Sequence, residues 1–196
     1  MKPITVLFFG SQGAGKGTQV KMLMEFLRSK SEQAMIHIDM GQELRDLRDT
    51  GSLAGKLTSE VIDIGARMPD FMPTYLQTKK LVNGLVKGDE HIIADGLARG
   101  SDQTRAFDDA MRFFKRDDFQ VISIELSEAS VVQRLLARGR NDDTEEGIKN
   151  RLGWYKTDVL PQLDLLKSRG RPVHVIDGEP DVETIHKEIL TKLALI

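Results

Sequence analysis

Short apolar runs alternate along the chain with stretches in which apolar residues recur at helical spacing. The runs span residues 4–9, 34–39, 91–95, 119–126 and 173–177. Continuous apolar runs of this length are typical of strands that are buried on both faces of a sheet. The pattern therefore predicts five buried strands.

Each apolar run is followed by at least one stretch with apolar residues three or four positions apart, which predicts a helix. The first stretch contains Val20, Leu23, Met24 and Leu27. Further helices are predicted over about 42–50, 53–64, 69–86, 107–114, 127–136, 148–159 and 182–193. We expect Pro69 in the first turn of its helix, Ser127 as a helix cap and a kink near Pro161.

The alternation of strands and helices predicts an α/β fold, a parallel sheet with helices on both faces. In such sheets, ligands bind at the carboxyl ends of the strands. The residues that follow each predicted strand are therefore the first candidates for a functional site.

A glycine-rich segment follows the first predicted strand and opens the first predicted helix. It reads Gly10-Ser11-Gln12-Gly13-Ala14-Gly15-Lys16-Gly17-Thr18. Glycines let the backbone curl so that its N–H groups surround phosphate oxygens, and Lys16 can then reach the β- and γ-phosphates. A simple turn is the alternative, but the strand–loop–helix context favours a phosphate-binding loop.

Arginines gather after the other predicted strands. They are Arg45, Arg99, Arg134, Arg138, Arg140 and Arg151. Arginines that converge on a phosphate loop suit phosphoryl transfer, because each offers a bidentate fork to phosphate oxygens. Asp95, at the end of the third strand, is placed to hold water molecules around Mg²⁺.

Several of these residues also have simpler interpretations. Arg45 could be a solvated residue on a polar helix face, and Asp95 could be a turn former at a strand end. Asp143 and Glu146 have the spacing of a helix capping box, a role that can coexist with a functional one. Trp154 and Tyr155 are interpreted as core or interface residues rather than as a base-stacking platform.

Composition narrows the range of functions. The chain has 196 residues, 40% of them hydrophobic, with a formal net charge of -2 and no cysteine. This balance predicts one globular domain without nucleic-acid or membrane partners. The missing cysteines exclude thiolate nucleophiles and cysteine-type zinc sites. Neither a signal peptide nor an apolar span is evident, so a cytoplasmic location is expected.

Three motifs in order resemble the adenylate kinase family of nucleoside monophosphate kinases, over essentially the whole chain. The first is the phosphate loop at residues 13–19, with its extra glycine. The second is Asp95-Gly96-Leu97-Ala98-Arg99, followed by Gln103. The third comprises Arg140, Asp142, Asp143, Glu146 and Arg151.

The resemblance implies the reversible, Mg²⁺-dependent reaction of ATP with AMP to give two ADP. It implies a P-loop NTPase-type sheet with a core at 1–39, 69–137 and 144–196. A mobile, helical monophosphate-binding segment would span about 40–68, and a minimal lid about 138–143. A monomer without structural zinc is expected.

The resemblance also assigns roles to individual residues. Catalysis would involve Lys16, Arg99, Arg138, Arg140 and Arg151. ATP would bind to Gly13, Ala14, Gly15, Lys16, Gly17, Thr18, Arg134 and Arg138. AMP would bind to Met40, Arg45, Arg67, Met68, Gly96, Arg99, Gln103, Arg140 and Arg151, and Asp95 would hold the metal through water.

Four departures from the family pattern concern the site. Gln12 stands in place of a proline in the loop, and Met40 removes a hydroxyl from the base pocket. Ala98 replaces the proline before Arg99, so we expect a trans peptide bond there and a slightly different placement of Arg99. Arg138-Gly139-Arg140 leaves room for only a minimal lid, which would exclude water less well.

Two alternatives to an AMP kinase remain open at this point. One is a kinase for UMP, CMP or another small acceptor, against which Gln103 argues. The other is a catalytically weak nucleotide-binding module of the same fold, suggested by the short lid and by Gln12 and Ala98. Activity on a panel of monophosphates separates the three.

Overall fold

Five parallel strands form the centre of the structure, a computed structural model that describes residues 1–140 and 143–196. Their order in the sheet is β2-β3-β1-β4-β5. The strands are β1 (Thr5–Phe9), β2 (Met35–Asp39), β3 (His91–Asp95), β4 (Gln120–Glu125) and β5 (Val173–Asp177). Pairing sets Val6 opposite Ile93 on one side of β1, and Leu7 opposite Val121 on the other. The predicted parallel sheet is confirmed.

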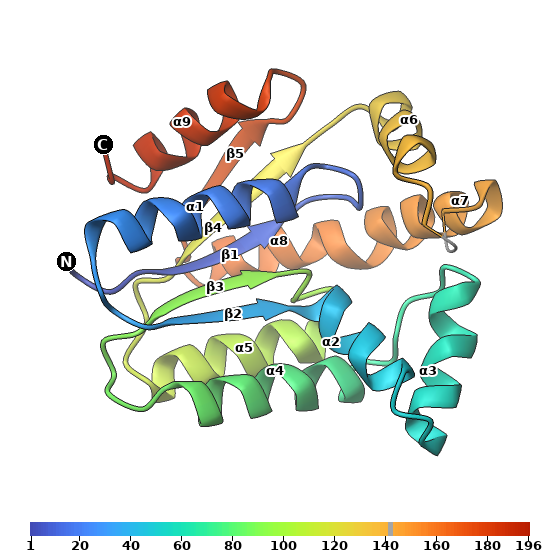
Figure 1. Ribbon diagram of the computed structural model, residues 1–196, viewed down its shortest axis with the longest axis horizontal. Helices are drawn as coiled ribbons and strands as arrows, with labels where there is room; N and C mark the ends of the chain where they lie inside the picture. The colour runs from blue at the N-terminus through green and yellow to red at the C-terminus, as the bar shows by residue number, and fades with distance from the viewer. Residues whose placement is uncertain (141–142) are drawn as a thin grey trace.

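Helices cover both faces of this sheet, as predicted (Figure 1). They are α1 (Lys16–Lys30), α2 (Met40–Arg48), α3 (Leu53–Asp63), α4 (Phe71–Gly84), α5 (Ser101–Phe113), α6 (Glu128–Arg138), α7 (Glu145–Trp154), α8 (Leu160–Ser168) and α9 (Val182–Lys192). A π-helical turn, Tyr155–Val159, joins α7 to α8. None of the described helices is long and apolar enough to cross a membrane.

Each face of the sheet has its own core. On one face α1 and α9 pack against the strands, with Leu23 and Ile189 fully buried between them (Figure 1). On the other face α4, α5 and α8 pack against the sheet around Phe107 and Leu166. Because apolar side chains lie on both sides, the strands are apolar throughout.

The structure corrects three local predictions. The helix that follows β2 begins at Met40 and not at residue 42, because Asp39 caps it by accepting a hydrogen bond from the backbone N of Gln42. Helix α4 begins at Phe71, so Pro69 lies before the helix. The capping box at Asp143 is also wrong, because Thr144 caps α7.

Two other local predictions are confirmed or refined. Ser127 caps α6 by accepting a hydrogen bond from the backbone N of Ser130. The distortion expected near Pro161 takes the form of the π-helical turn, which ends two residues before this proline. Such turns widen a helix locally and are frequent near functional sites.

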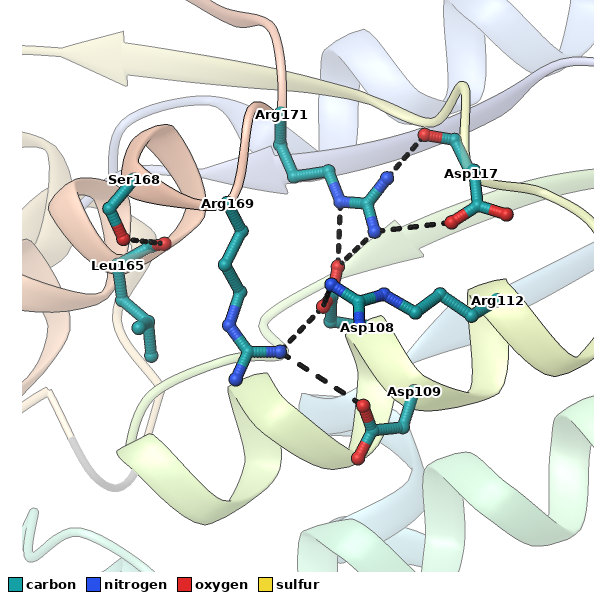
Figure 2. A network of polar contacts seen from close by, with 8 residues as sticks. All are labelled: Asp108, Asp109, Arg112, Asp117, Leu165, Ser168, Arg169 and Arg171. Atoms are coloured by element: carbon teal, nitrogen blue, oxygen red, sulfur yellow. Dashed lines mark hydrogen bonds and ion pairs between the residues drawn. The ribbon is translucent and has the colours of Figure 1, made fainter.

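A buried ion-pair network holds the connection between α8 and β5 against α5 (Figure 2). The carboxylate of Asp108, on α5, has no exposed surface and receives Arg169 Nη1 at 2.6 Å and Arg171 Nε at 2.6 Å. Arg112 Nη2 lies 3.3 Å from the same carboxylate. The Arg171 guanidinium also donates to the backbone oxygen of Asp117. A fully buried carboxylate is therefore compensated by three arginines.

The carboxyl ends of the strands all point to the same side of the molecule (Figure 1). Helices α2, α3, α6 and α7 lie on that side, and the N-terminus of α1 faces it. The fold thus collects the segments that follow the strands at one edge of the sheet.

Candidate functional site

A cavity of about 720 Å³ lies at this edge of the sheet. Every residue predicted to belong to the site lines it. The set comprises Gly13, Ala14, Gly15, Lys16, Gly17, Thr18, Met40, Arg45, Arg67, Met68, Asp95, Gly96, Arg99, Gln103, Arg134, Arg138, Arg140 and Arg151. The volume lies within the usual range for small-molecule sites.

The phosphate loop curls tightly between β1 and α1. Gly10 has a φ of 137°, and a Cβ there would lie 2.5 Å from the backbone oxygen of Ile124, so no side chain fits. Gly15 is the N-cap of α1 in the left-handed conformation. The loop therefore presents its backbone and the positive end of α1 to the cavity, which is an arrangement that binds anions.

Lys16 is the first residue of α1 and is buried. Its Nζ donates hydrogen bonds to the backbone oxygens of Gly10 at 3.0 Å and Ser11 at 2.9 Å. Burial lowers the pKa of Lys16, and the nearby carboxylate of Asp95 partly opposes this shift. An ammonium group desolvated in this way gains strongly from an anionic ligand.

Asp95 is the last residue of β3 and lies near Lys16. Its Oδ1 lies 4.0 Å from Lys16 Nζ and, although buried, has no hydrogen-bond partner among the residues that the structure describes. Burial raises the pKa of Asp95, and the charge of Lys16 opposes the shift. Two titratable groups with pKa values perturbed by burial and by each other mark this part of the cavity as a functional site.

The position of the Asp95 carboxylate is compatible with the predicted role, in which it binds Mg²⁺ through water molecules. A buried oxygen beside a phosphate loop, with no hydrogen bond from any described residue, is a suitable acceptor for metal-bound water. Thr18, which carries a hydroxyl group, lines the same cavity. Within the described residues no group of three or more acidic or histidine side chains could enclose a cation. The donor set thus suits a hydrated Mg²⁺ that arrives with nucleotide phosphates.

Asp143 holds the arginines of α6 and α7 together. Its carboxylate accepts hydrogen bonds from Arg138 Nε at 2.8 Å, from Arg138 Nη2 at 2.7 Å and from Arg151 Nη1 at 2.8 Å. The backbone N of Arg140 also donates to it, at 3.2 Å. Burial would raise the pKa of Asp143, but the hydrogen bonds from Arg138 and Arg151 outweigh it and lower the pKa. Asp142, from the same predicted motif, lies outside the described residues.

Trp154, interpreted from the sequence as a core or interface residue, also lines the cavity. The Arg99 guanidinium lies 5.5 Å from the centre of its ring, within cation–π range. Its indole Nε1 donates to the backbone oxygen of Gly65 at 2.9 Å. Trp154 thus joins α7 to Arg99 and to the turn between α3 and α4.

Sequence reasoning missed Asp70. This residue precedes α4, and its carboxylate pairs with Arg67 and accepts a hydrogen bond from Gln103 Nε2 at 2.9 Å. Arg67 Nε also lies 3.0 Å from Asp158, on the π-helical turn. The spacing from Asp70 to Gln103 carries no sequence signal, because α4 and β3 separate the two residues.

The two ends of the cavity differ in character. At one end Arg134 Nη2 donates to the backbone oxygen of Gly178 at 3.0 Å, and residues 180–182 complete the wall. At the other end Arg45 Nη2 donates to Gln42 Oε1 at 2.9 Å, and Met40 is almost fully buried.

No peptide bond between described residues is cis, so the expected trans bond at Ala98 is confirmed.

Comparison with known proteins agrees with this geometry. A model of the family described as "Adenylate kinase" matches residues 8–171, which is most of the chain. The chain belongs to the adenylate kinase family. The adenylate kinase of Prochlorococcus marinus (strain MIT 9211) is 32% identical over 191 residues, covering 97% of each chain.

Two further relatives of the family show similar coverage. "Adenylate kinase 1" of Nostoc sp. (strain PCC 7120) is 30% identical over 188 residues, which is 96% of this chain and 97% of the relative. The adenylate kinase of Leptospira biflexa is 30% identical over 192 residues, covering 96% and 98%. The adenylate kinase resemblance of the three motifs thus extends over nearly the full length.

Proposed function

We propose that this protein is an adenylate kinase that catalyses the reversible transfer of the γ-phosphoryl group of ATP to AMP, giving two ADP. One observation carries the proposal. A single cavity is lined by a phosphate loop with its buried lysine, by several arginines and by Gln103. A site that must bring two nucleotides together needs phosphate-binding groups between two separate base pockets.

In this proposal the chain positions two phosphate groups and stabilises the charge that spreads over the transferred one. The loop and Lys16 hold the ATP phosphates, while Arg99 and Arg151 hold the AMP phosphate opposite them. Little covalent chemistry is required of the protein, because positioning and electrostatics supply most of the rate enhancement in phosphoryl transfer.

Arg138 and Arg140 complete the positive surroundings of the transferred group. The Asp143 carboxylate fixes the guanidinium of Arg138 and one nitrogen of Arg151 before substrate arrives. Preorganised cations lose little free energy to reorganisation during the reaction. Bound Mg²⁺ would neutralise charge on the ATP phosphates, with Asp95 holding its water ligands.

Other monophosphates are the main alternative acceptors. Gln103 favours AMP over GMP and UMP, since an amide held in one orientation can pair with both the amino donor and the ring-nitrogen acceptor on the adenine edge. A catalytically weak nucleotide-binding module gains no support, because the charged side chains that transfer requires all line the cavity. We also propose that residues 40–68 move on acceptor binding and that residues 138–143 form the whole lid.

ADP formation from ATP, Mg²⁺ and AMP, GMP, CMP or UMP tests the proposal. We expect ADP with AMP, and a loss of roughly 10²–10³-fold in kcat for Lys16→Ala, as for removal of other preorganised charge-stabilising groups. Arg99→Ala is expected to reduce activity severely. Lys21→Ala, on the exposed side of α1, is the matched control and keeps wild-type activity. No ADP with any monophosphate would refute the proposal.

A further inference from the structure

The side-chain amide of Gln103 is held at both of its ends. Its Oε1 accepts a hydrogen bond from the backbone N of Arg99 at 3.3 Å, and its Nε2 donates to Asp70 Oδ1 at 2.9 Å. A backbone N–H can only donate, and an ion-paired carboxylate can only accept. The two partners therefore decide which end of the amide is oxygen and which is nitrogen.

Asp70 is linked to the cavity through Gln103 and Arg67, which both line it. Gln103 lines the cavity and is 1% exposed, whereas Asp70 is not among the cavity-lining residues. The Asp70 side chain is 17% exposed, and the oxygen that accepts from Gln103, Oδ1, also pairs with Arg67 Nη1. It is thus a partner of the amide and not a group that touches the acceptor.

We propose that Asp70 is a positioning residue that sets the preference of the site for 6-amino over 6-oxo purine monophosphates. This inference rests on the proposed function, in which Gln103 contacts the acceptor base. The adenine edge offers an amino donor and the N1 acceptor. These match the second lone pair of the Gln103 oxygen and the second N–H of its nitrogen, respectively. The hypoxanthine edge offers the reverse, a carbonyl acceptor and an N1–H donor.

A rotated Gln103 amide would match the 6-oxo edge, but the surroundings oppose that rotation. Rotation would turn the amide nitrogen toward the Arg99 N–H and the amide oxygen toward the Asp70 carboxylate. Two donors would then face each other at Arg99, and two acceptors at Asp70. Both contacts are buried, where the loss of a hydrogen bond costs free energy. Of these two constraints, Asp70 supplies the one that a side-chain substitution can remove.

Asp70→Asn tests this role with almost no change of shape. An asparagine at this position can donate as well as accept, so it permits the rotated amide. AMP and IMP have the same ribose and phosphate and nearly the same size, so effects of the substitution on net charge or on stability act on both equally. We expect the AMP to IMP ratio of kcat/KM to fall by about tenfold or more.

Asp70→Ala is the comparison variant, because it removes the carboxylate without offering a donor. The AMP to IMP ratio of kcat/KM is expected to fall less in Asp70→Ala than in Asp70→Asn. In the phosphorylation of IMP, an oxygen of its phosphate attacks the γ-phosphorus of ATP and the bond to the β-phosphate oxygen breaks, giving ADP and IDP. Competitive binding of AMP and IMP to each protein, measured by equilibrium dialysis, gives the same ratio without turnover.

The outcomes separate the inference from the proposed function. An unchanged AMP to IMP ratio in Asp70→Asn, or an equal loss for both nucleotides, overturns the role of Asp70. If wild-type protein makes no ADP from AMP, the proposed function fails, and the binding ratio still tests Asp70. Should Asp70→Asn not fold, as judged by circular dichroism, an unchanged binding ratio in Asp70→Ala overturns the inference.

Discussion

Glu90 shows how a single residue can carry stability without any recognisable motif. Its buried carboxylate accepts hydrogen bonds from three backbone N–H groups, those of Val86 at 3.0 Å, Lys87 at 2.7 Å and Gly88 at 2.8 Å. Burial opposes ionisation, but these hydrogen bonds outweigh it and lower the pKa of Glu90 to about 2. The carboxylate therefore fixes the turn between α4 and β3.

We predict that this residue makes stability depend on pH between about 4.5 and 2. The pKa is lower in the folded state than in the unfolded chain, so the contribution is complete above the unfolded value of 4.5 and is lost as pH falls toward 2. The shift corresponds to about 3 kcal/mol at neutral pH. Glu90→Gln should lower the free energy of unfolding by up to this amount at pH 7.

Urea unfolding at pH 7, 5, 4 and 3 measures the effect. The difference between wild type and Glu90→Gln should shrink as pH falls below 4.5. Asp89→Asn is the matched control, because Asp89 directly precedes Glu90 in the sequence and is exposed. A constant difference across this range would contradict the prediction.

The sequence could not reveal Glu90 or Asp70 as important residues. A carboxylate that binds backbone amides leaves no pattern of side-chain types, and the Asp70–Gln103 contact joins distant segments. Lys16 was identifiable because the phosphate loop is local and its spacing is fixed by the chemistry of phosphate binding. Local motifs are thus visible in a single sequence, whereas partners from distant elements are not.

At the scale of elements, the C-terminal part of the predicted monophosphate-binding segment is joined to α7. Asn150 Nδ2 donates to the backbone oxygen of Ile64 at 3.0 Å, and Trp154 Nε1 donates to that of Gly65 at 2.9 Å. A Cβ at Gly65 would lie 2.7 Å from the backbone oxygen of Gly147, so the two segments meet through glycines. The turn between α3 and α4 is therefore docked directly on the helix that carries Arg151.

We predict that Trp154→Phe weakens acceptor binding more than turnover. The variant keeps an aromatic ring near Arg99 but loses the hydrogen bond to Gly65. A buried hydrogen bond contributes about 1 kcal/mol, which corresponds to a rise of about fivefold in KM for AMP. Trp154→Leu should have a larger effect, because it also removes the cation–π contact with Arg99.

Steady-state kinetics with varied AMP at saturating ATP measure this split between KM and kcat. Trp154 is the single tryptophan of the chain, so wild-type fluorescence during an AMP titration reports on its surroundings directly. An unchanged KM in both variants would show that the contact has no part in acceptor binding.

A second prediction at this scale concerns the Asp108 network (Figure 2). Asp108→Asn leaves Arg169 and Arg171 without their buried counter-charge, and breaking such a pair costs about 3–5 kcal/mol. Asp109→Asn is the matched control, because Asp109 is 71% exposed and lies 4.0 Å from Arg169. Asp109→Asn should change the free energy of unfolding by less than about 1 kcal/mol.

Denaturant unfolding of the two variants measures the difference. Both should keep their activity under conditions where they are folded, because Asp108 and Asp109 do not line the cavity. Equal stabilities for the two variants would refute the proposed dependence on Asp108.

For the molecule as a whole, periodicity predicted the elements well and their ends less well. All five strands and eight of the described α-helices were expected, because buried strands and amphipathic helices have distinct periods, whereas α8 follows the kink near Pro161 and was not predicted as a separate helix. The start of α2 at Met40 and the cap at Thr144 depend on which side chain captures a free backbone N–H, and neighbouring residues compete for that role. The strand order β2-β3-β1-β4-β5 depends on long-range packing, about which periodicity is silent.

We propose that the connection between α6 and α7 closes the site. Helix α6 ends at Arg138, Gly139 caps it in the left-handed conformation, and α7 begins at Glu145. If residues 138–143 are the whole lid, as we propose, little protein is available to cover the transferring phosphate. Water would then compete with AMP as the acceptor of the phosphoryl group.

We therefore predict that the protein hydrolyses ATP slowly when no AMP is present. Inorganic phosphate released from Mg²⁺-ATP should exceed that of Lys16→Ala, which serves as the control for contaminating activity. Addition of AMP should suppress the release, because the acceptor displaces water from the space between the two nucleotides. Phosphate release at the level of Lys16→Ala would show that this short connection excludes water as effectively as transfer requires.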